Sequence, residues 1–326
     1  MNQQHLQYYL QSIYEHIHQN ELREAKSVLK GMIDSYPNDL TWEVYHIRGV
    51  VKWLSSDLEG AEREFKRSLS MNTSQAFVHN NLGNVFYAQK RIEDAILSYK
   101  RALELDEKYA QAHSHLGLSY CVLKDLESAQ RHHQKAMELE PNNPEFCYNF
   151  SLLHHRRSDY IQMEVYLRRA LAISPDDPEV YVQLGICMLE QSRIPEARSF
   201  FAQGMGKNPQ KFEFMVYLAL CAVEEGLLEE AKGRLETVLE YDPHYAFALV
   251  EYAKIMQQEH VIPLAQKCLE QAVESAPENA EVWRELGNVF HIQNQIQRAI
   301  ESYEKSLQLD EEQPELLLQL KGLASI

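Results

Sequence analysis

The chain has 326 residues, of which 45% are hydrophobic, and it carries a formal net charge of −16. This length suffices for two compact domains or for one long repeat array. The negative charge repels polyanions, and no run of Lys and Arg offsets it, so we expect no nucleic acid among the partners.

The N-terminal sequence and the cysteines bear on the cellular compartment of the protein. The N-terminus, MNQQHLQYYL, has no basic stretch followed by an apolar one, so we expect no signal peptide. No window approaches the roughly 20 apolar residues of a membrane span. Five scattered cysteines without a CxxC pair indicate reduced thiols, and we therefore predict a cytoplasmic protein.

The sequence repeats itself with a period of 34 residues. A degenerate first copy fits residues 6–39, in which Ala25, Leu29 and Pro37 keep the pattern, and two extra residues follow it. Eight further copies then run without insertions, at 42–75, 76–109, 110–143, 144–177, 178–211, 212–245, 246–279 and 280–313. The last stretch, 314–326, reads PELLLQLKGLASI and is interpreted as a lone capping helix.

Each copy contains two helical patterns. Apolar or small residues fall at repeat positions 4, 7, 8 and 11 and again at 20, 24, 27 and 28, which is the spacing of one helix face. Small residues at positions 8 and 20 allow two backbones to approach, and a ring such as Tyr99 at position 24 fills the space beside them. Proline at position 32 ends the second helix, while Pro195 and Pro263 suit its first turn.

The pattern resembles the tetratricopeptide repeat over almost the whole chain. The resemblance rests on motifs such as Asn81-Leu82-Gly83-Asn84 followed by Ala95, Tyr99 and Ala102. It implies an all-α fold, an α-solenoid of tandem helix-turn-helix repeats that form a right-handed superhelix. In that family the first helix of each repeat lines a concave wall, where extended peptides or partner helices bind.

Some copies depart from the family pattern. Arg48 replaces Leu at position 7 of the second copy. Gly204 and Gly206 fall inside the second helix of the copy at 178–211, and each interior glycine costs about 0.5–1 kcal/mol relative to Ala. We therefore expect this copy to be the least stable. The Lys positions of the family's clamp for a C-terminal carboxylate do not match, so we do not expect such a clamp.

Positions 2, 5, 6, 9, 12 and 13 of the first helices form the face not used for packing, and we take this wall as the candidate partner site because it is free of structural duty. In repeats three to five these positions hold mainly amide, ring and hydroxyl groups, which suit the main chain of an extended peptide. The alternative is an ordinary polar surface. The candidate residues are Asn80, Asn81, Asn84, Tyr87, Ser114, His115, Tyr148, Asn149, His155 and Arg156.

Repeats six and seven place aliphatic residues at the same positions, with glutamates beside them. The candidate residues are Val182, Ile186, Leu189, Glu190, Val216, Leu220 and Glu224, with Val223, Glu179 and Glu213 nearby. An apolar strip with acidic edges suits an amphipathic basic helix. Two alternatives stay open: neighbouring repeats bury the strip, or the glutamates at position 2 complement helix N-termini.

Catalytic and metal motifs are absent from the sequence, and we predict no enzyme activity and no cofactor. The pairs His132-His133 and His154-His155 cannot chelate one metal, because adjacent helical residues point about 100° apart. His133, at position 24, is expected to be a packed ring. Cys187 and Cys221 are expected to be buried apolar residues.

The favoured interpretation is a scaffold or adaptor that binds a segment of a partner protein in the groove. One alternative is a regulatory or targeting subunit of a multi-protein enzyme complex. Another is a scaffold that self-assembles into homo-oligomers through its ends or its apolar groove.

Overall fold

A computed structural model describes residues 3–38 and 40–323, and in these residues the chain forms 19 α-helices and no strand. The chain divides into two compact units, Met1–Ile173 (unit 1) and Ser174–Ile326 (unit 2), which are described separately. The prediction of an all-α array of helix pairs is confirmed.

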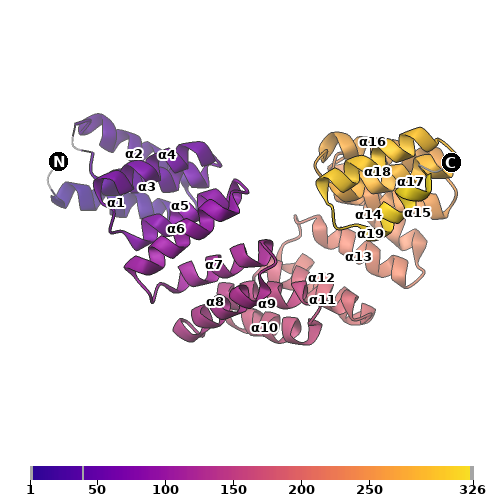
Figure 1. The fold of residues 1–326 in the computed structure, drawn as a ribbon, viewed down its shortest axis with the longest axis horizontal. Helices are drawn as coiled ribbons and strands as arrows, with labels where there is room; N and C mark the ends of the chain where they lie inside the picture. Colours follow the sequence, from indigo (N-terminus) through magenta and orange to yellow (C-terminus); the bar gives the residue numbers. More distant parts are fainter. Residues whose placement is uncertain (1–2, 39, 324–326) are drawn as a thin grey trace. The chain divides into compact units, whose positions relative to one another are not determined.

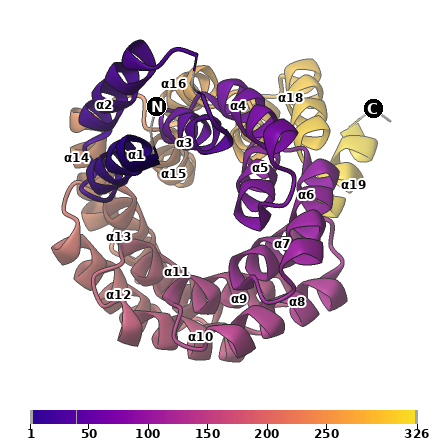
Figure 2. The same cartoon turned by 90° about the vertical axis from the view of Figure 1, so that its left-hand side faces the viewer.

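Unit 1 consists of five helix pairs (Figure 1). Its helices are α1 (Gln3–His18), α2 (Leu22–Ser35), α3 (Trp42–Leu54), α4 (Leu58–Met71), α5 (Ala76–Ala88), α6 (Ile92–Leu105), α7 (Ala110–Val122), α8 (Leu126–Leu139), α9 (Pro144–Arg156) and α10 (Tyr160–Ile173). Figure 2 shows α3, α5, α7 and α9 along the inner side of this unit, with the even-numbered helices behind them.

Unit 2 consists of four helix pairs and a final single helix in the described residues. Its helices are α11 (Pro178–Glu190), α12 (Ile194–Lys207), α13 (Glu213–Glu224), α14 (Leu228–Tyr241), α15 (Ala246–Gln258), α16 (Ile262–Ser275), α17 (Ala280–Ile292), α18 (Ile296–Leu309) and α19 (Pro314–Leu323). We call the odd-numbered member of each pair its first helix.

In five of the nine pairs a glycine and a ring pack the two helices together, as the spacing predicts. At position 8 an added Cβ would collide with the ring at position 24, so this site accepts no larger residue without a shift. The pairs are Gly49 with Phe65, Gly83 with Tyr99, Gly117 with His133, Gly185 with Phe201 and Gly287 with Tyr303. Alanine at position 20 is fully buried in most repeats. These contacts make the helix pair the unit of the core.

The turn inside each pair uses one left-handed residue at position 15. Its φ lies between 55° and 61° at Lys90, Ser158 and their counterparts, and only Gly226 is a glycine. The residue ends the first helix, since the next backbone N–H bonds a carbonyl five residues back, as from Arg91 to Phe86. Every pair in the described residues therefore turns in the same way, which fixes the direction of the first helices.

The two glycines of α12 have different surroundings. A Cβ on Gly204 would collide with the ring of Phe214 and with Tyr181, whereas a Cβ on Gly206 would meet nothing. We predict that Gly206→Ala stabilises unit 2 by about 0.5–1 kcal/mol, because only the helix propensity changes. Gly204→Ala should instead destabilise it by about 1–3 kcal/mol through overpacking. Urea denaturation of both variants measures this, and equal effects would contradict the packing argument.

Candidate functional site

Consecutive first helices of unit 1 are joined by polar side chains at positions 5 and 6. The Asn81 amide donates to His46 Nε2 over 3.1 Å, and His115 Nδ1 donates to Asn80 Oδ1 over 3.0 Å. The Asn149 amide donates to Ser114 Oγ over 3.0 Å. In each case position 5 of one repeat bonds position 6 of the next. We call these six residues the polar ladder.

The polar ladder corrects the prediction that this wall is free of structural duty. Asn80, Ser114 and Asn149 are 3%, 0% and 5% exposed, so they cannot form the main contacts with a partner. Asn81 and His115 are only half-buried, but each is already bonded within the ladder. A buried polar group needs such a partner, and here the neighbouring repeat supplies it.

Asn84 has a structural role of a different kind. Its Oδ1 accepts a 2.8 Å hydrogen bond from the Tyr99 hydroxyl, which joins the first and second helices of one repeat. Asn288 and Tyr303 repeat this bond at 2.9 Å in unit 2. Beside Asn81, Asn84 and His115, four further candidate residues of unit 1 keep an accessible surface: Tyr87, Tyr148 and His155 are half-buried and Arg156 is exposed. Burial raises the pKa of Tyr87, which stays a neutral hydroxyl.

We expect the removal of a buried member of the polar ladder to lower the stability of unit 1. Asn149→Ala should destabilise unit 1 by about 1–3 kcal/mol, because it leaves the buried Ser114 hydroxyl without its donor. Arg156→Ala, seven residues further along α9 and exposed, should change stability by less than about 0.5 kcal/mol. Thermal denaturation of the two variants tests this. Equal stability would show that the ladder does not hold the repeats together.

In unit 2 burial removes two residues from the predicted apolar strip and leaves the others as candidates. Val182 and Val216, at position 5, are 2% and 0% exposed, and Val216 belongs to the core cluster of α13 to α19. These two residues therefore pack within the unit and do not line a surface. Ile186, Leu189 and Leu220 are half-buried, as is Val223. We call these four residues of α11 and α13 the aliphatic strip.

Two glutamates stand beside this aliphatic strip. Glu190 and Glu224 are both exposed and are the last residues of α11 and α13. The carbonyl end of a helix carries partial negative charge, so a carboxylate there does not stabilise the helix. Helix formation therefore does not account for these two acidic residues.

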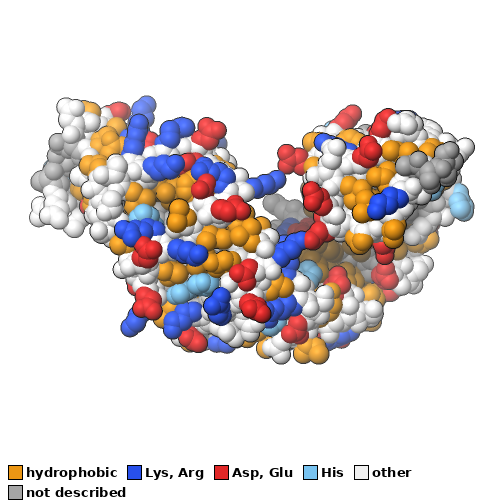
Figure 3. Space-filling model, viewed as in Figure 1, with side chains coloured by type: hydrophobic (Ala, Val, Ile, Leu, Met, Phe, Trp, Pro, Cys, Tyr) orange, Lys and Arg blue, Asp and Glu red, His pale blue; other side chains and the backbone are white. Residues whose placement is uncertain are grey.

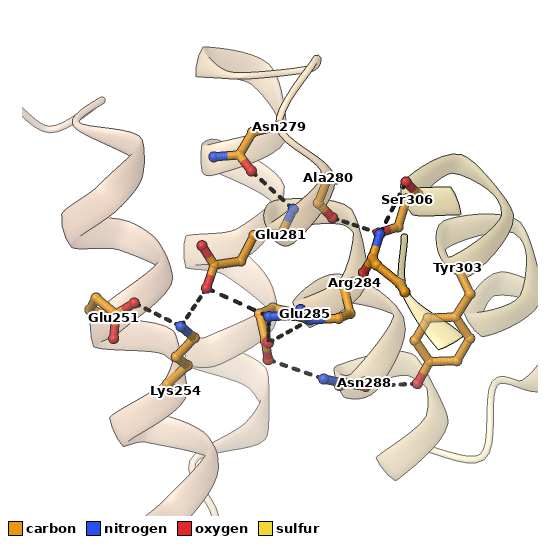
Figure 4. Close-up of polar contacts among 11 residues, drawn as sticks. Glu251, Lys254, Asn279, Ala280, Glu281, Arg284, Glu285, Asn288, Tyr303 and Ser306 are labelled. Atoms are coloured by element: carbon orange, nitrogen blue, oxygen red, sulfur yellow. Dashed lines mark hydrogen bonds and ion pairs between the residues drawn. The ribbon is translucent and has the colours of Figure 1, made fainter. Parts of the chain in front are cut away.

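A charged network that was not predicted from the sequence lies in repeats eight and nine, as Figure 4 shows. Lys254 Nζ lies 2.7 Å from both Glu251 and Glu281, and Glu285 accepts from Arg284 and from the Asn288 amide. Glu251 and Glu285 are 7% and 8% exposed. Burial raises the pKa of Glu251. The opposite charges at repeat positions 2, 5, 6 and 9 are the feature of the sequence that could have predicted this network.

Next to this network lies a polar pocket of about 630 Å³ between α17 and α19. Three carboxylates and one guanidinium line it, so its formal charge is negative. The lining residues are Arg284, Glu285, Asn288, Glu312, Gln313, Pro314, Glu315, Leu316 and Gln319. A pocket of this composition suits a basic side chain.

The two units differ strongly in charge. Unit 2 has 26 acidic and 12 basic side chains, a formal charge of −14, whereas unit 1 has 22 and 20, a formal charge of −2. Figure 3 shows acidic and basic side chains mixed over the face of unit 1, and fewer basic ones over that of unit 2. The attraction for a cationic partner is therefore concentrated in unit 2.

Four histidines of unit 1 are buried, namely His46, His113, His133 and His154. His133 is 1% exposed and stacks on Phe150, as its repeat position predicts, and burial lowers its pKa to about 3. In the described residues, no three His, Cys, Asp or Glu side chains gather as a metal site would require. Cys187 and Cys221 are fully buried, which confirms that prediction, and burial raises the pKa of the Cys221 thiol to about 11.

Comparison with known proteins identifies the repeat. Models of the TPR repeat match residues 83–123, and models of the tetratricopeptide repeat match 157–214 and 257–314. A search of curated proteins found no match. No described helix is both long and apolar enough to span a membrane.

Three solved structures share the fold. The Cut9–Hcn1 hetero-tetramer of APC/C matches with a TM-score of 0.63 and 14% identity, over 94% of this chain and 60% of that one. IFIT1 with m7Gppp-AAAA matches with a TM-score of 0.61 and 14% identity, over 95% and 82%. A tetratricopeptide repeat protein from Parabacteroides merdae matches with a TM-score of 0.56 and 17% identity, over 87% and 99%. At these identities the similarity shows the fold alone.

Proposed function

Since this chain is a tetratricopeptide-repeat protein, we propose that it is an interaction scaffold that holds a basic amphipathic helix of a partner protein on the first helices of unit 2. The observation that carries this proposal is the half-buried aliphatic strip on α11 and α13 with the exposed carboxylates of Glu190 and Glu224 at its edge. Helix-in-groove recognition uses such a strip for the apolar face of the ligand.

The charges of unit 2 support a basic partner over an acidic one. Lysines or arginines flanking the apolar face of the ligand would meet Glu190 and Glu224. A further basic side chain would fit the acidic pocket beside Glu285 and Glu315. Attraction to a unit of charge −14 also speeds the encounter with a cationic helix. We further propose a cytoplasmic location, in keeping with the five free, buried thiols.

A fluorescent 18-residue helical peptide with leucines at i, i+3, i+4 and i+7 and lysines elsewhere tests the proposal. We expect the double variant Glu190→Lys/Glu224→Lys to weaken its binding about tenfold or more, as measured by anisotropy. The matched control is Glu240→Lys/Glu274→Lys, which makes the same charge change at exposed sites on α14 and α16. An equal loss of peptide binding in the control variant would show that the peptide is held by general charge attraction and not at the proposed site.

The two alternatives predict different results. A self-assembling scaffold would show a molar mass that rises with protein concentration in light scattering. A regulatory subunit would co-purify with a catalytic chain from native lysate. The proposed scaffold is expected to stay monomeric without its partner and to bind the basic peptide without an enzyme present.

A further inference from the structure

The interface between the first two repeats of unit 1 differs in residue type from the interfaces in front of repeats three and nine. In repeats three and nine, position 7 holds a leucine and position 11 a phenylalanine. These residues are Leu82 and Phe86, and Leu286 and Phe290, and all four are buried. An arginine then covers each phenylalanine ring, at 4.3 Å for Arg91 and 3.9 Å for Arg298. A pocket of about 380 Å³ lies beside Leu286 and Phe290, where the lining carries two carboxylates and two cations.

In repeat two, positions 7 and 11 both carry cations. Arg48 occupies position 7 and Lys52 occupies position 11. The Arg48 guanidinium turns away to the buried carboxylate of Glu64, at 3.1 Å, and Lys52 pairs with Asp57 at 2.8 Å. A pocket of about 370 Å³ lies between α2 and α3, over the apolar side chains of Leu29, Ile33 and Val51. We call this the basic pocket.

A second difference lies at position 21, where other repeats bridge to the turn of the next repeat. Lys232 reaches Glu259 over 2.8 Å, and Gln266 reaches Gln293 over 2.8 Å. Lys26 holds this position in the first repeat, where the corresponding turn residue is Ser55, whose hydroxyl donates to the Val51 carbonyl. Among the described residues Lys26 and Lys30 have no ion-pair partner, although both line the basic pocket.

The charge of the basic pocket opposes that of the chain. Its lining contains Lys26, Lys30, Arg48 and Lys52 against the single carboxylate of Asp57. The Glu64 carboxylate behind the pocket neutralises one more cation, which leaves an excess of two positive charges in a chain of net charge −16. Apolar side chains below cations are suited to an anion that carries an aliphatic group.

We propose that the basic pocket is a second, separate site that binds an acidic segment of a partner protein. One aliphatic side chain of that segment enters between Leu29, Ile33 and Val51, and neighbouring carboxylates pair with Lys26 and Lys30. This site lies in unit 1, so it does not depend on the basic helix proposed for unit 2. It gives the two units opposite charge preferences.

The test uses a fluorescein-labelled peptide, Glu-Glu-Leu-Glu-Glu, and fluorescence anisotropy. We expect Lys26→Glu/Lys30→Glu to weaken binding about tenfold or more, since two charge pairs become repulsive. The control Lys108→Glu/Lys135→Glu makes the same charge change on unit 1 outside the pocket and should change binding less than threefold by screened, long-range repulsion alone. Equal weakening in both variants would overturn the proposal.

A filling variant tests the pocket without reversing a charge cluster. Lys52→Phe places at position 11 the residue found in repeats three and nine, and it should keep the fold. We expect it to weaken binding of the peptide, because it removes one cation of the lining and adds a ring there, and a peptide with serine in place of leucine should bind weakly to the wild type. Full binding by Lys52→Phe would overturn the proposal. Self-association that is lost on Lys26→Glu would also overturn it, in favour of a second copy of the chain.

Discussion

Acidification from pH 7 to pH 5 is expected to destabilise unit 1 by several kcal/mol and to leave unit 2 folded. Unit 1 contains buried histidines whose pKa values burial lowers, to about 4 for His46 and His132 and about 3 for His133, from 6.5. Between the lowered pKa values and 6.5, the unfolded chain therefore binds more protons than the folded unit does. Stability is full above pH 6.5 and is lost as the pH falls towards 4.

The size of this effect follows from the pKa values. At pH 5 each of these three histidines costs about 2 kcal/mol, since one pKa unit corresponds to about 1.4 kcal/mol. Burial lowers the pKa of His113 and His154 in the same direction. Together these costs amount to several kcal/mol, which is a large part of the stability of a typical domain.

Unit 2 provides the internal control. Its three histidines, His244, His260 and His291, are exposed. Burial raises the pKa of Glu251, so protonation of this carboxylate stabilises the folded unit as the pH falls. Native-state hydrogen exchange, corrected for the intrinsic rate at each pH, should show loss of protection in α3 to α9 at pH 5 and little in α13 to α17. An equal loss in both units would contradict the histidine account.

His133→Phe is expected to stabilise unit 1 by about 2 kcal/mol at pH 7 and by about twice that at pH 5. Neither ring nitrogen of His133 has a hydrogen-bond partner among the described residues, although the side chain is buried. An unpaired buried polar group costs about 1–3 kcal/mol, and phenylalanine removes both of them. A phenylalanine ring should pack on Gly117, because Phe201 packs on Gly185 at the same repeat positions.

The matched control for this variant is His115→Phe. His115 Nδ1 bonds the buried Asn80, so phenylalanine at this site leaves the Asn80 carbonyl without its donor. We expect His115→Phe to destabilise unit 1 at pH 7, while His133→Phe stabilises it. Urea denaturation at pH 7 and pH 5 measures both. Destabilisation by His133→Phe would show that the ring nitrogens of His133 have hydrogen-bond partners in solution.

The sequence predicted the contacts within a repeat better than those between repeats. Gly83 and Tyr99 show their pairing by residue type alone, because only a residue without a side chain fits beneath the ring. Asn80 and Asn149 gave no such signal, since a polar residue on a helix face is equally suited to solvent or to a buried partner. The signal lies in pairs of polar residues 35 positions apart, such as Ser114 and Asn149.

The candidate site was predictable to a similar extent. The partly exposed positions of Ile186 and Leu189 and the exposure of Glu190 follow from the repeat register. The burial of Val182 and Val216 does not, because it depends on how closely consecutive repeats pack. Arg48 was visible as a departure at position 7, but neither the pairing of its guanidinium with Glu64 nor the cationic lining of the basic pocket follows from that departure alone.

The most direct test of the scaffold proposal is methyl NMR of protein labelled at Ile, Leu and Val, titrated with the lysine-rich helical peptide. The account predicts that the methyl signals of Ile186, Leu189, Leu220 and Val223 shift, while those of the buried Val44 and Val85 in unit 1 do not. Binding that shifts the signals of unit 1 and leaves those four residues unchanged would contradict it.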